Sequence, residues 1–407
     1  MRLLILTQYY PPEIGAPQNR LHELAIRLQK QGIHVEVLTA MPNYPKMEIQ
    51  AGYEKGKIKE EIIDGIPVHR AKIYVSKSKS IISRLLNYFS FVFTSWWRGR
   101  KLPAFDFLMV ESPPLFLGYS ALRLSKKLNA KLIFNVSDLW PESAEKLGLV
   151  TNKQLLGLAY RLEAKCYNRA ALVTGQTQGI VDDIRQRFPH KQVTWLPNGV
   201  DLSYYNPEVV QPIGYRERNG FSANQTLFFY GGVIGFAQGL DIILHAAKHF
   251  ILNENVQFIL QGAGPERERL LDLKAELGVN NVHFIAPVTK AEMPGVLKEI
   301  NVAIIPLRKL DLFEGAIPSK VFETLAMEVP ILLGVDGEAK RHFVEKAQSA
   351  LFCEPENVEV LVENIQFLLD HPENAKEMGK KGRLYANDYF NRNNIAQKFI
   401  EDLKAIP

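Results

Sequence analysis

The stretch LFEGAIPSKVFETLAMEVPILL, from Leu312 to Leu333, predicts a loop, then a helix, then a short buried strand that begins near Pro330. The helix is expected to begin at Pro318 and Ser319, because a serine beside a proline is typical of a helix N-terminus. Backbone N–H groups point outward at such an end, and the helix dipole adds partial positive charge. This end of the helix is therefore a candidate site for an anion.

Two charged residues of the same helix extend this interpretation. Lys320 places a positive charge in the first turn, where the dipole disfavours it, so the lysine is better explained if it faces a phosphate. Glu323 lies one turn further and close to the same face, where it could accept hydrogen bonds from sugar hydroxyls. The alternative is an ordinary surface cap with a solvated lysine and glutamate, and spacing alone does not choose between them.

Outward from this stretch, both halves of the chain alternate short apolar runs with helical patterns. In the second half, the expected strands are Leu227–Tyr230, Gln257–Leu260, Val282–Ile285 and Ala303–Ile305, with helices at 239–250, 266–277 and 291–299. In the first half, the expected strands are Leu3–Leu6, Val35–Leu38, Phe107–Glu111, Lys131–Val136 and Leu172–Thr174. This alternation predicts an α/β fold of two Rossmann-like domains that face each other across a cleft, with ligands at the carboxyl ends of parallel strands.

The domain limits follow from length and from one irregular segment. A chain of 407 residues exceeds what one hydrophobic core usually serves. Residues 202–225 are rich in Pro, Gly, Asn and Tyr without clear periodicity, which places the boundary near them. We therefore expect a first domain over 1–200, a second over 201–385, and a C-terminal helix over 386–407 that packs back onto the first.

Composition narrows the functional classes. The net charge of +5, from 49 basic and 44 acidic residues, is too weak and dispersed to argue for nucleic acid, but it suits anionic ligands or an acidic membrane surface. Cys166 and Cys353 are the only cysteines, so neither a disulfide framework nor a zinc site is indicated, and the reducing cytosol is the expected compartment. No stretch reaches the ~20 uncharged residues of a membrane-spanning helix.

In the first half, candidate ligand-contacting residues follow two of the expected strands. Gly15, in the loop after the first strand, would let the backbone approach a ligand closely. Asp138 stands at the end of the strand over Lys131–Val136, where doubly wound domains keep their chemistry, and is a candidate contact to substrate. A turn or helix-cap role for Asp138 is nearly as compatible with the sequence. Glu142 could face the acceptor or cap the next helix.

The segment SIISRLLNYFSFVFTSWWRGRK predicts a helix whose apolar residues nearly encircle it, with Trp96 and Trp97 beside Arg98. Aromatic rings and basic residues are favoured together at a bilayer interface, so this pattern favours a helix in peripheral contact with a membrane. The alternative is a helix buried within the first domain.

These motifs together resemble the retaining nucleotide-sugar glycosyltransferases of family 4, which have the GT-B fold. The resemblance rests on the first proline- and glycine-bearing loop, Pro197–Asp201, Gln238–Leu240, Gln261–Pro265 and Glu323–Pro330. VSDLWPES, GFAQGL and IPSKVFE are most similar to bacterial fucosamine (N-acetyl-L-fucosamine) transferases of O-antigen and capsule assembly. The resemblance implies transfer of a sugar, with retained configuration, from a nucleotide diphosphate donor bound by the second domain. It also implies a lipid-linked saccharide acceptor, and hence a cytoplasmic protein on the inner face of the cell membrane.

The resemblance suggests a set of site residues, with two departures from the family pattern. The usual first glutamate falls on Gly315, with Glu314 one residue early, and the usual arginine and lysine of the glycine loop fall on Gly232 and Gln238. Lys320 and the amides beside it are expected to replace the missing cations, with Arg308 or Arg267 in reserve. The donor is expected to be a UDP-sugar. The residues expected to bind it are Gly15, Gly232, Gln238, Gly264, Ala286, Val288, Glu314, Pro318, Ser319, Lys320 and Glu323.

Asp138, Lys320 and Glu323 are the expected catalytic residues, and no cofactor is expected. No Asp-x-Asp motif occurs, which predicts activity without a metal ion. Two other functions compete. A nucleotide-sugar 2-epimerase of the same fold would need no acceptor and no aromatic-basic helix. A non-enzymatic dinucleotide-binding protein would need a third glycine after Gly262 and Gly264, where Arg267 stands instead.

Overall fold

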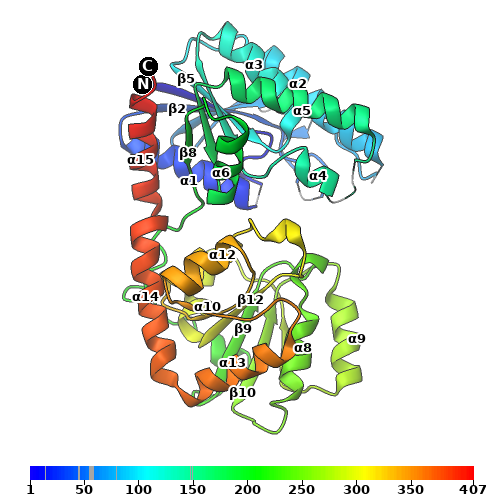
Figure 1. Cartoon of the computed structure of the whole chain (residues 1–407), viewed down its shortest axis with the longest axis vertical. Coiled ribbons are helices and arrows are strands. Elements are labelled where there is room, and N and C mark those ends of the chain that lie inside the picture. The colour runs from blue at the N-terminus through cyan, green and yellow to red at the C-terminus, as the bar shows by residue number, and fades with distance from the viewer. Residues whose placement is uncertain (14, 45, 55–58, 79, 147, 149) are drawn as a thin grey trace. The chain divides into compact units, whose positions relative to one another are not determined.

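The computed structural model describes the whole chain except residues 14, 45, 55–58, 79, 147 and 149 (Figure 1). It divides into two compact units. Unit 1 comprises Met1–Asn198 and Arg392–Pro407, and unit 2 comprises Gly199–Asn391. The first boundary lies two residues before the expected one at 200, and the chain returns to unit 1 six residues after the expected 386. The irregular segment 202–225 belongs entirely to unit 2.

Within the described residues, unit 1 contains an eight-stranded sheet in the order β3-β4-β2-β1-β5-β6-β7-β8. Every neighbouring pair is parallel except β3 and β4, which form an antiparallel hairpin. The strands are β1 (Arg2–Leu6), β2 (His34–Ala40), β3 (Glu60–Ile63), β4 (Ile66–Ala71), β5 (Phe107–Ser112), β6 (Lys131–Val136), β7 (Leu172–Gly175) and β8 (Val193–Trp195). The expected strands of the first half are thereby confirmed.

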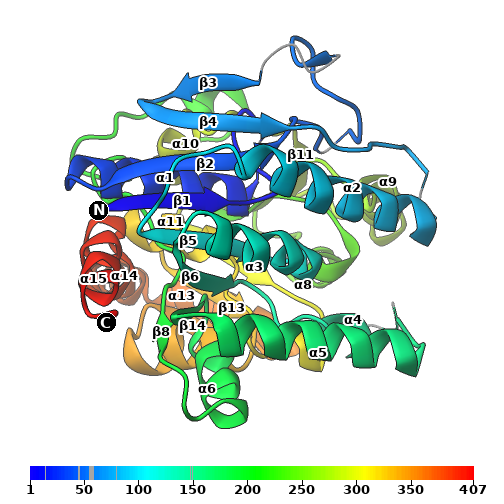
Figure 2. The same ribbon diagram turned by 90° about the horizontal axis from the view of Figure 1, so that it is seen from above.

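Helices cover both faces of this sheet because its central strands are apolar on both sides. Leu4 and Leu6 of β1 belong to one buried cluster, whereas Leu3 and Ile5 belong to the other. Helices α2, α3 and α5 lie side by side over the first cluster, and α1 and α15 pack against the second (Figures 1 and 2). The helices are α1 (Ala16–Lys30), α2 (Ile81–Gly99), α3 (Gly118–Lys127), α4 (Glu142–Lys146), α5 (Lys153–Arg169), α6 (Gln178–Arg187) and α15 (Arg392–Lys404).

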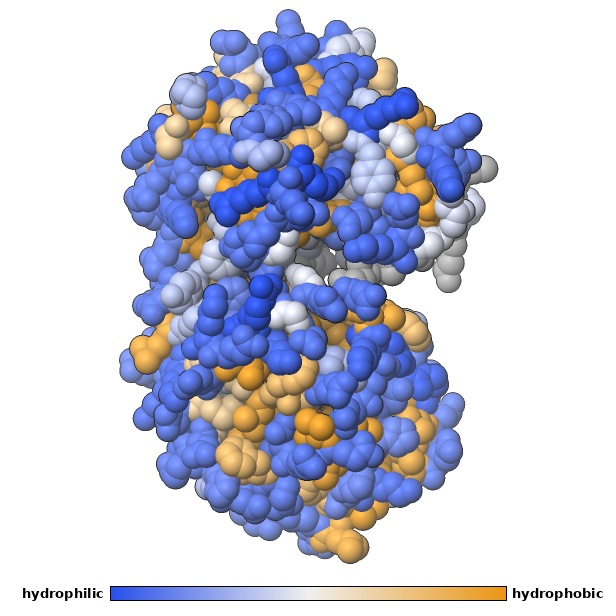
Figure 3. Space-filling model, in the orientation of Figure 1, coloured by the Kyte–Doolittle hydropathy of each residue, from blue (hydrophilic) through white to orange (hydrophobic). Residues whose placement is uncertain are grey.

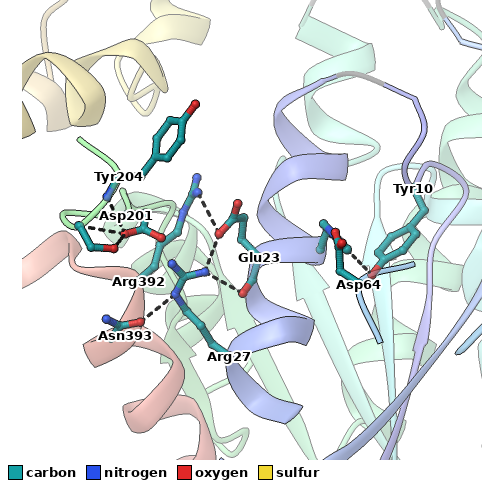
Figure 4. Close-up of polar contacts among 10 residues, drawn as sticks. Tyr10, Glu23, Arg27, Asp64, Asp201, Tyr204, Arg392 and Asn393 are labelled. Atoms are coloured by element: carbon teal, nitrogen blue, oxygen red, sulfur yellow. Dashed lines mark hydrogen bonds and ion pairs between the residues drawn. The ribbon is translucent and has the colours of Figure 1, made fainter. Parts of the chain in front are cut away.

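The C-terminal helix α15 is held to α1 by polar contacts as well as by the buried cluster. Arg27 of α1 donates through Nε to Asn393 at 2.9 Å and through Nη1 to the backbone carbonyl of Glu23 at 3.0 Å (Figure 4). Glu23 is also 3.8 Å from a guanidinium nitrogen of Arg392. These contacts place the last helix within unit 1, as the sequence predicts for the C-terminal segment.

Unit 2 contains a six-stranded parallel sheet in the order β11-β10-β9-β12-β13-β14. Its strands are β9 (Thr226–Gly231), β10 (Val256–Gln261), β11 (Val282–Ile285), β12 (Val302–Pro306), β13 (Ile331–Gly334) and β14 (Ala350–Phe352). Its helices are α7 (Tyr215–Arg218), α8 (Asp241–Lys248), α9 (Arg267–Leu277), α10 (Met293–Glu299), α11 (Lys320–Ala326), α12 (Glu338–Lys340), α13 (Val358–Asp370) and α14 (Pro372–Phe390). The two α/β domains with parallel sheets expected from the sequence are confirmed.

The surface of the face drawn in Figure 3 is mainly hydrophilic, with hydrophobic side chains in separate patches. In the described part of the chain, no helix is both long enough and apolar enough to cross a membrane. Cys166 and Cys353 are both free and buried.

Candidate functional site

In unit 2, the loops that follow β9 and β10 meet at the carboxyl edge of the sheet. The N–H of Gly232 donates to the carbonyl of Gln261 at 2.9 Å, and the N–H of Ile234 donates to the carbonyl of Ala263 at 2.9 Å. A Cβ at Gly262 would overlap the carbonyl oxygen of Gly232, and one at Gly264 would overlap that of Ile234. Gly262 also has a φ of 148°, which L side chains rarely adopt. These glycines therefore allow two loops to pack backbone against backbone.

Lys320 places its ammonium beside this pair of loops. It begins α11, as the sequence predicts, although the Ser319 hydroxyl makes no capping hydrogen bond. Lys320 Nζ lies 3.8 Å from the ring centroid of Tyr230 and 2.9 Å from the position that a Cβ on Gly232 would take. The missing side chain at Gly232 thus leaves the space that the lysine uses.

Removal from solvent is the main cause of the altered ionisation of Lys320. Desolvation lowers the pKa of its ammonium to about 7, and the charge of Glu323 partly opposes that shift. Both residues line a cavity of about 40 Å³ next to Gly231 and the strand residues Ala303 and Ile305. Because a water molecule occupies about 30 Å³ of liquid volume, this cavity has room for about one water molecule. Lys320 and Glu323 are therefore neighbours, as predicted from their spacing.

The two reserve cations have other partners. Arg308 donates to the carbonyl of Phe236 at 2.9 Å and pairs with Glu356 at 2.8 Å and with Asp241 at 3.3 Å. Arg267 lies 3.4 Å from Glu268 and 5.9 Å from the ring centroid of Phe284. Arg308 is thus committed to holding the loop after β12 against the glycine loop, which argues against its use as a replacement cation.

The remaining donor-side candidates surround the same edge or its neighbouring loops. Ala286, exposed at the end of β11, accepts a hydrogen bond from Gln261 Nε2 at 3.1 Å, and Val288 is half-buried two residues later. The carbonyl of Glu314 accepts from the N–H of Glu338 at 2.8 Å, while the Glu314 side chain is exposed. Half-buried residues complete the set: Gln238 in the short helical turn Phe236–Gln238, and Pro318 just before α11.

In unit 1, the predicted polar residues already have partners within the chain. The Asp138 carboxylate accepts hydrogen bonds from Trp140 Nε1 at 3.0 Å and from Ser143 Oγ at 2.6 Å. This geometry matches the turn role left open for Asp138. Glu142 begins α4 and pairs with Lys146 at 2.7 Å, which matches its helix-end alternative. Gly15 precedes α1 with extended backbone.

Sequence reasoning missed a buried polar network at the carboxyl ends of β5 and β6. Arg20 donates to Glu111 and to Ser137 Oγ, the latter at 2.7 Å, and Ser137 also donates to Glu111. Asn135 donates to the other carboxylate oxygen of Glu111 and accepts from Thr174 at 2.6 Å. Arg20 and Glu111 are separated by 91 residues, so no local spacing links them. The only signal was polarity in strands that are otherwise apolar.

In helix α2, the predicted membrane residues Trp96, Trp97 and Arg98 differ in their exposure to solvent. Trp96 packs against the core, and Arg98 pairs with Glu60 of β3 at 2.7 Å, so neither faces solvent freely. Trp97 is 50% exposed, and Phe93, 62% exposed, stacks on it with ring centroids 6.3 Å apart. The aromatic surface therefore centres on Phe93 and Trp97 instead of the Trp96–Trp97 pair.

Among the described residues, no group of three or more His, Cys, Asp or Glu side chains is arranged to hold a metal ion. The polar groups at the unit 2 edge instead include the loop backbone and the side chains of Lys320 and Glu323, with Arg308 held in ion pairs nearby. Such an arrangement can neutralise an anionic group and accept hydrogen bonds from hydroxyls.

Comparison with known proteins identifies the class of this fold. Sucrose-phosphate synthase from Thermosynechococcus elongatus superimposes with a TM-score of 0.75 at 17% identity, over 99% of this chain and 98% of that one. HepE from Anabaena, solved with UDP and glucose, superimposes with a TM-score of 0.70 at 16% identity over the full length of both chains. The fold is thus the two-domain GT-B fold of glycosyltransferases, as predicted.

Sequence matches show which families each half of the chain is similar to. Residues 15–199 match the glycosyl transferase 4-like domain, and residues 214–385 match glycosyl transferases group 1. The chain is 24% identical over 417 residues, 99% of its length and 100% of the relative's, to the putative colanic acid biosynthesis glycosyl transferase WcaI of Escherichia coli. The chain is thus similar to the glycosyl transferase 4-like domain in its first half and to glycosyl transferases group 1 in its second half. The epimerase and dinucleotide-binding interpretations are not favoured by these matches.

Proposed function

We propose that this glycosyltransferase transfers a sugar, with retention of configuration and without a metal ion, from a UDP-sugar to a lipid-linked saccharide in surface polysaccharide assembly. The observation that carries the proposal is the position of Lys320 Nζ beside Gly232, where the β9 and β10 loops meet. A diphosphate there would be neutralised by one ammonium and by backbone amides. The sugar is an N-acetylated deoxyhexosamine, a choice supported by the resemblance of three motifs to fucosamine transferases.

In the proposed reaction, the bond between the sugar C1 and the diphosphate oxygen breaks, and the nucleoside diphosphate leaves with the bonding electrons. The acceptor hydroxyl oxygen forms the new bond to C1 on the same face, and its proton passes to an oxygen of the departing diphosphate. Lys320 stabilises the charge on that leaving group, and Glu323 accepts hydrogen bonds from the ribose.

Named relatives support the choice of donor and pathway. HepE was solved in complex with UDP and glucose, and WcaI is described as a colanic acid biosynthesis enzyme. The donor is tested by thermal shift of the purified protein against UDP-, GDP- and TDP-sugars, since binding to the folded state alone raises stability. We expect UDP-sugars to give the largest shift. A larger shift with a GDP- or TDP-sugar would overturn the UDP assignment.

The phosphate role of Lys320 is tested by Lys320→Ala. Removing a group that stabilises the transition-state charge should lower kcat/KM about 10²–10³-fold. Lys340→Ala is the matched control, because Lys340 also stacks on an aromatic ring, 3.9 Å from the Phe352 centroid, and pairs with Asp336. Unchanged turnover of Lys320→Ala at subsaturating donor would refute the assignment. Loss of activity in EDTA that a divalent ion restores would refute metal independence.

The acceptor side of the proposal places the protein in the cytoplasm, peripherally on the inner face of the cell membrane. Leu86, Phe89, Phe93 and Trp97 are exposed along α2 at spacings of three or four residues, so they share one helix face. Arg100 lies 3.6 Å from the ring centroid of Trp97. Such an apolar face with a basic end suits insertion among lipid headgroups.

A double variant, Phe93→Ser with Trp97→Ser, tests this membrane contact. It should weaken binding to phosphatidylcholine vesicles, measured by flotation, because less apolar area enters the interface. The control is Leu252→Ser, which removes a 96% exposed apolar side chain of unit 2. Equal vesicle binding by the wild type and the double variant would contradict the contact.

A further inference from the structure

We propose that a basic groove between α3 and α5 binds the phosphates of anionic phospholipids. The groove has a volume of about 270 Å³, near the lower end of the roughly 300–1,000 Å³ of small-ligand sites. Its lining consists of Tyr119, Leu122, Arg123, Lys126, Lys165 and Arg169. This inference rests on the membrane contact in the proposed function and assigns it a ligand.

The two helices are held close together by a small residue. A Cβ added at Gly118 would meet the sulfur of Cys166, so α3 and α5 approach each other closely at this point. One face of each helix then turns toward the groove, because its residues recur three or four positions apart. On α3 these are Tyr119, Leu122, Arg123 and Lys126, and on α5 they are Lys165 and Arg169. The fold therefore brings four cations together over an apolar floor.

These four cations have no acidic partner among the described residues. Arg123 donates to the backbone carbonyl of its neighbour Tyr119 at 3.2 Å, which leaves its charge uncompensated. Lys126 and Arg169 lie in the last turns of their helices, where the dipole favours a cation. That structural explanation does not extend to Arg123 or Lys165, which lie one turn earlier.

Like charges so close together repel one another. Arg123 and Lys126 are three residues apart, and Lys165 and Arg169 are four apart, which are the spacings at which side chains on a helix meet. A bound anion would relieve this repulsion. Other basic residues of unit 1 contrast with them, since Arg98 pairs with Glu60 and Arg187 with Glu163 at 2.8 Å.

The position of the groove favours a lipid over a soluble anion. Helix α3 packs between α2 and α5, and the buried hydroxyls of Ser95 and Ser120 join α2 to α3 at 2.9 Å (Figures 1 and 2). The exposed aromatic face of α2 therefore neighbours the groove, and Phe89 contacts Phe116 just before α3, with centroids 4.9 Å apart. Apolar insertion and adjacent cations together match an anionic bilayer surface.

The test is vesicle flotation with the full chain, using phosphatidylcholine alone and phosphatidylcholine with phosphatidylglycerol. We expect Lys126→Gln with Lys165→Gln to lower binding to the phosphatidylglycerol vesicles about 30-fold, from the usual contribution of two basic residues near an anionic surface. Binding to phosphatidylcholine alone should be unchanged. A second variant, Arg123→Gln with Arg169→Gln, should behave in the same way.

The matched control is Lys248→Gln with Lys380→Gln, which removes the same charge from two exposed lysines of unit 2. Equal losses in the two lysine variants would overturn the proposal, because net charge alone would then explain binding. Displacement from vesicles by inorganic phosphate, or nucleic-acid binding that needs the same two lysines, would also overturn it. UDP-sugar binding in solution is measured in parallel: its absence would count against the proposed function and leave the vesicle result standing.

Discussion

The carboxyl edges of the two sheets are built from different chemical groups, side chains in unit 1 and backbone in unit 2. In unit 1, side chains fill the edge: Arg20, Glu111, Asn135 and Ser137 hydrogen-bond to one another, although Arg20 Nη1 is buried without a hydrogen-bond partner among the described residues. In unit 2, the edge consists mainly of glycine backbone, with the Lys320 ammonium close to it. The same α/β topology therefore provides a network of polar side chains at one edge and closely packed backbone loops beside the Lys320 ammonium at the other.

This difference teaches where each unit can accept a ligand group. Buried side-chain networks rigidify an edge because each member already has a partner. Loops packed through glycine carry no side chains at the point of contact, which leaves the space beside Gly232 that the Lys320 ammonium uses. The comparison predicts effects on donor binding, on stability and on the pH dependence of donor affinity, in decreasing order of size.

Gly262→Ala should abolish donor binding. The added Cβ would overlap the Gly232 carbonyl, and a φ of 148° in a residue with a side chain costs about 1–3 kcal/mol by itself. The two loops must then separate, which moves the amides away from Lys320. Calorimetric titration with the donor measures this loss.

The control for this variant is Gly157→Ala, within α5. A Cβ there meets nothing within 4 Å, and replacing a mid-helix glycine usually stabilises by about 0.5–1 kcal/mol. Donor binding by Gly262→Ala at wild-type affinity would show that the close packing of the loops is not needed for the site.

Arg20→Ala should lower the free energy of unfolding by about 3–5 kcal/mol, because it leaves the Glu111 carboxylate buried without its cation. Adding Glu111→Gln should restore much of the loss, since the amide oxygen still accepts hydrogen bonds and carries no charge. Urea unfolding followed by circular dichroism measures both variants.

Arg98→Ala breaks a more exposed arginine pair in the same unit, with Glu60, and should cost about 1 kcal/mol or less. If Arg20→Ala and Arg98→Ala lost the same stability, the unit 1 edge would not depend on its buried network.

Donor affinity should depend on pH through Lys320. Its pKa is lowered to about 7 by desolvation, and a bound diphosphate favours the charged form, so donor binding takes up a proton above that pH. Affinity should fall about tenfold per pH unit above about pH 7. Calorimetry in two buffers of different ionisation enthalpy should give uptake of about one proton near pH 8 and almost none near pH 6.

Lys320→Arg provides the control, because arginine stays charged over this range. Its donor affinity should therefore show no such pH dependence and no proton uptake. A flat profile for the wild type would mean that the lysine does not contact the diphosphate.

The sequence allowed the scaffold to be predicted more fully than the site. Apolar runs such as Leu3–Leu6 and Ala303–Ile305 are long enough to identify strands, and the Pro-Ser-Lys sequence predicted that a helix begins where α11 does. The stacking of Lys320 on Tyr230, 90 residues away, depends on the order of β9 and β12 in the sheet. The order of the strands in the sheet cannot be predicted from any local sequence pattern.

Charge partners were the least predictable feature. Arg308 and Arg98 looked available because their acids, Glu356 and Glu60, are remote in sequence. Conversely, the sequence gives no sign that the four cations between α3 and α5 lie together. They come from two separate helices, and only the packing of these helices brings them into one groove. Pairing across the fold therefore decides which charges are free to bind a ligand.

The return of the chain to unit 1 at Arg392 has a consequence for synthesis on the ribosome. Ala396, Phe399 and Leu403 complete the buried cluster beneath α1, so part of the apolar face of the unit 1 sheet stays uncovered until α15 has been synthesised. All residues of unit 2, from Gly199 to Asn391, are synthesised before the segment Arg392–Pro407 that completes unit 1. Nascent unit 1 is therefore the half that needs protection from aggregation, and a chain that stops before Arg392 would keep this apolar surface exposed.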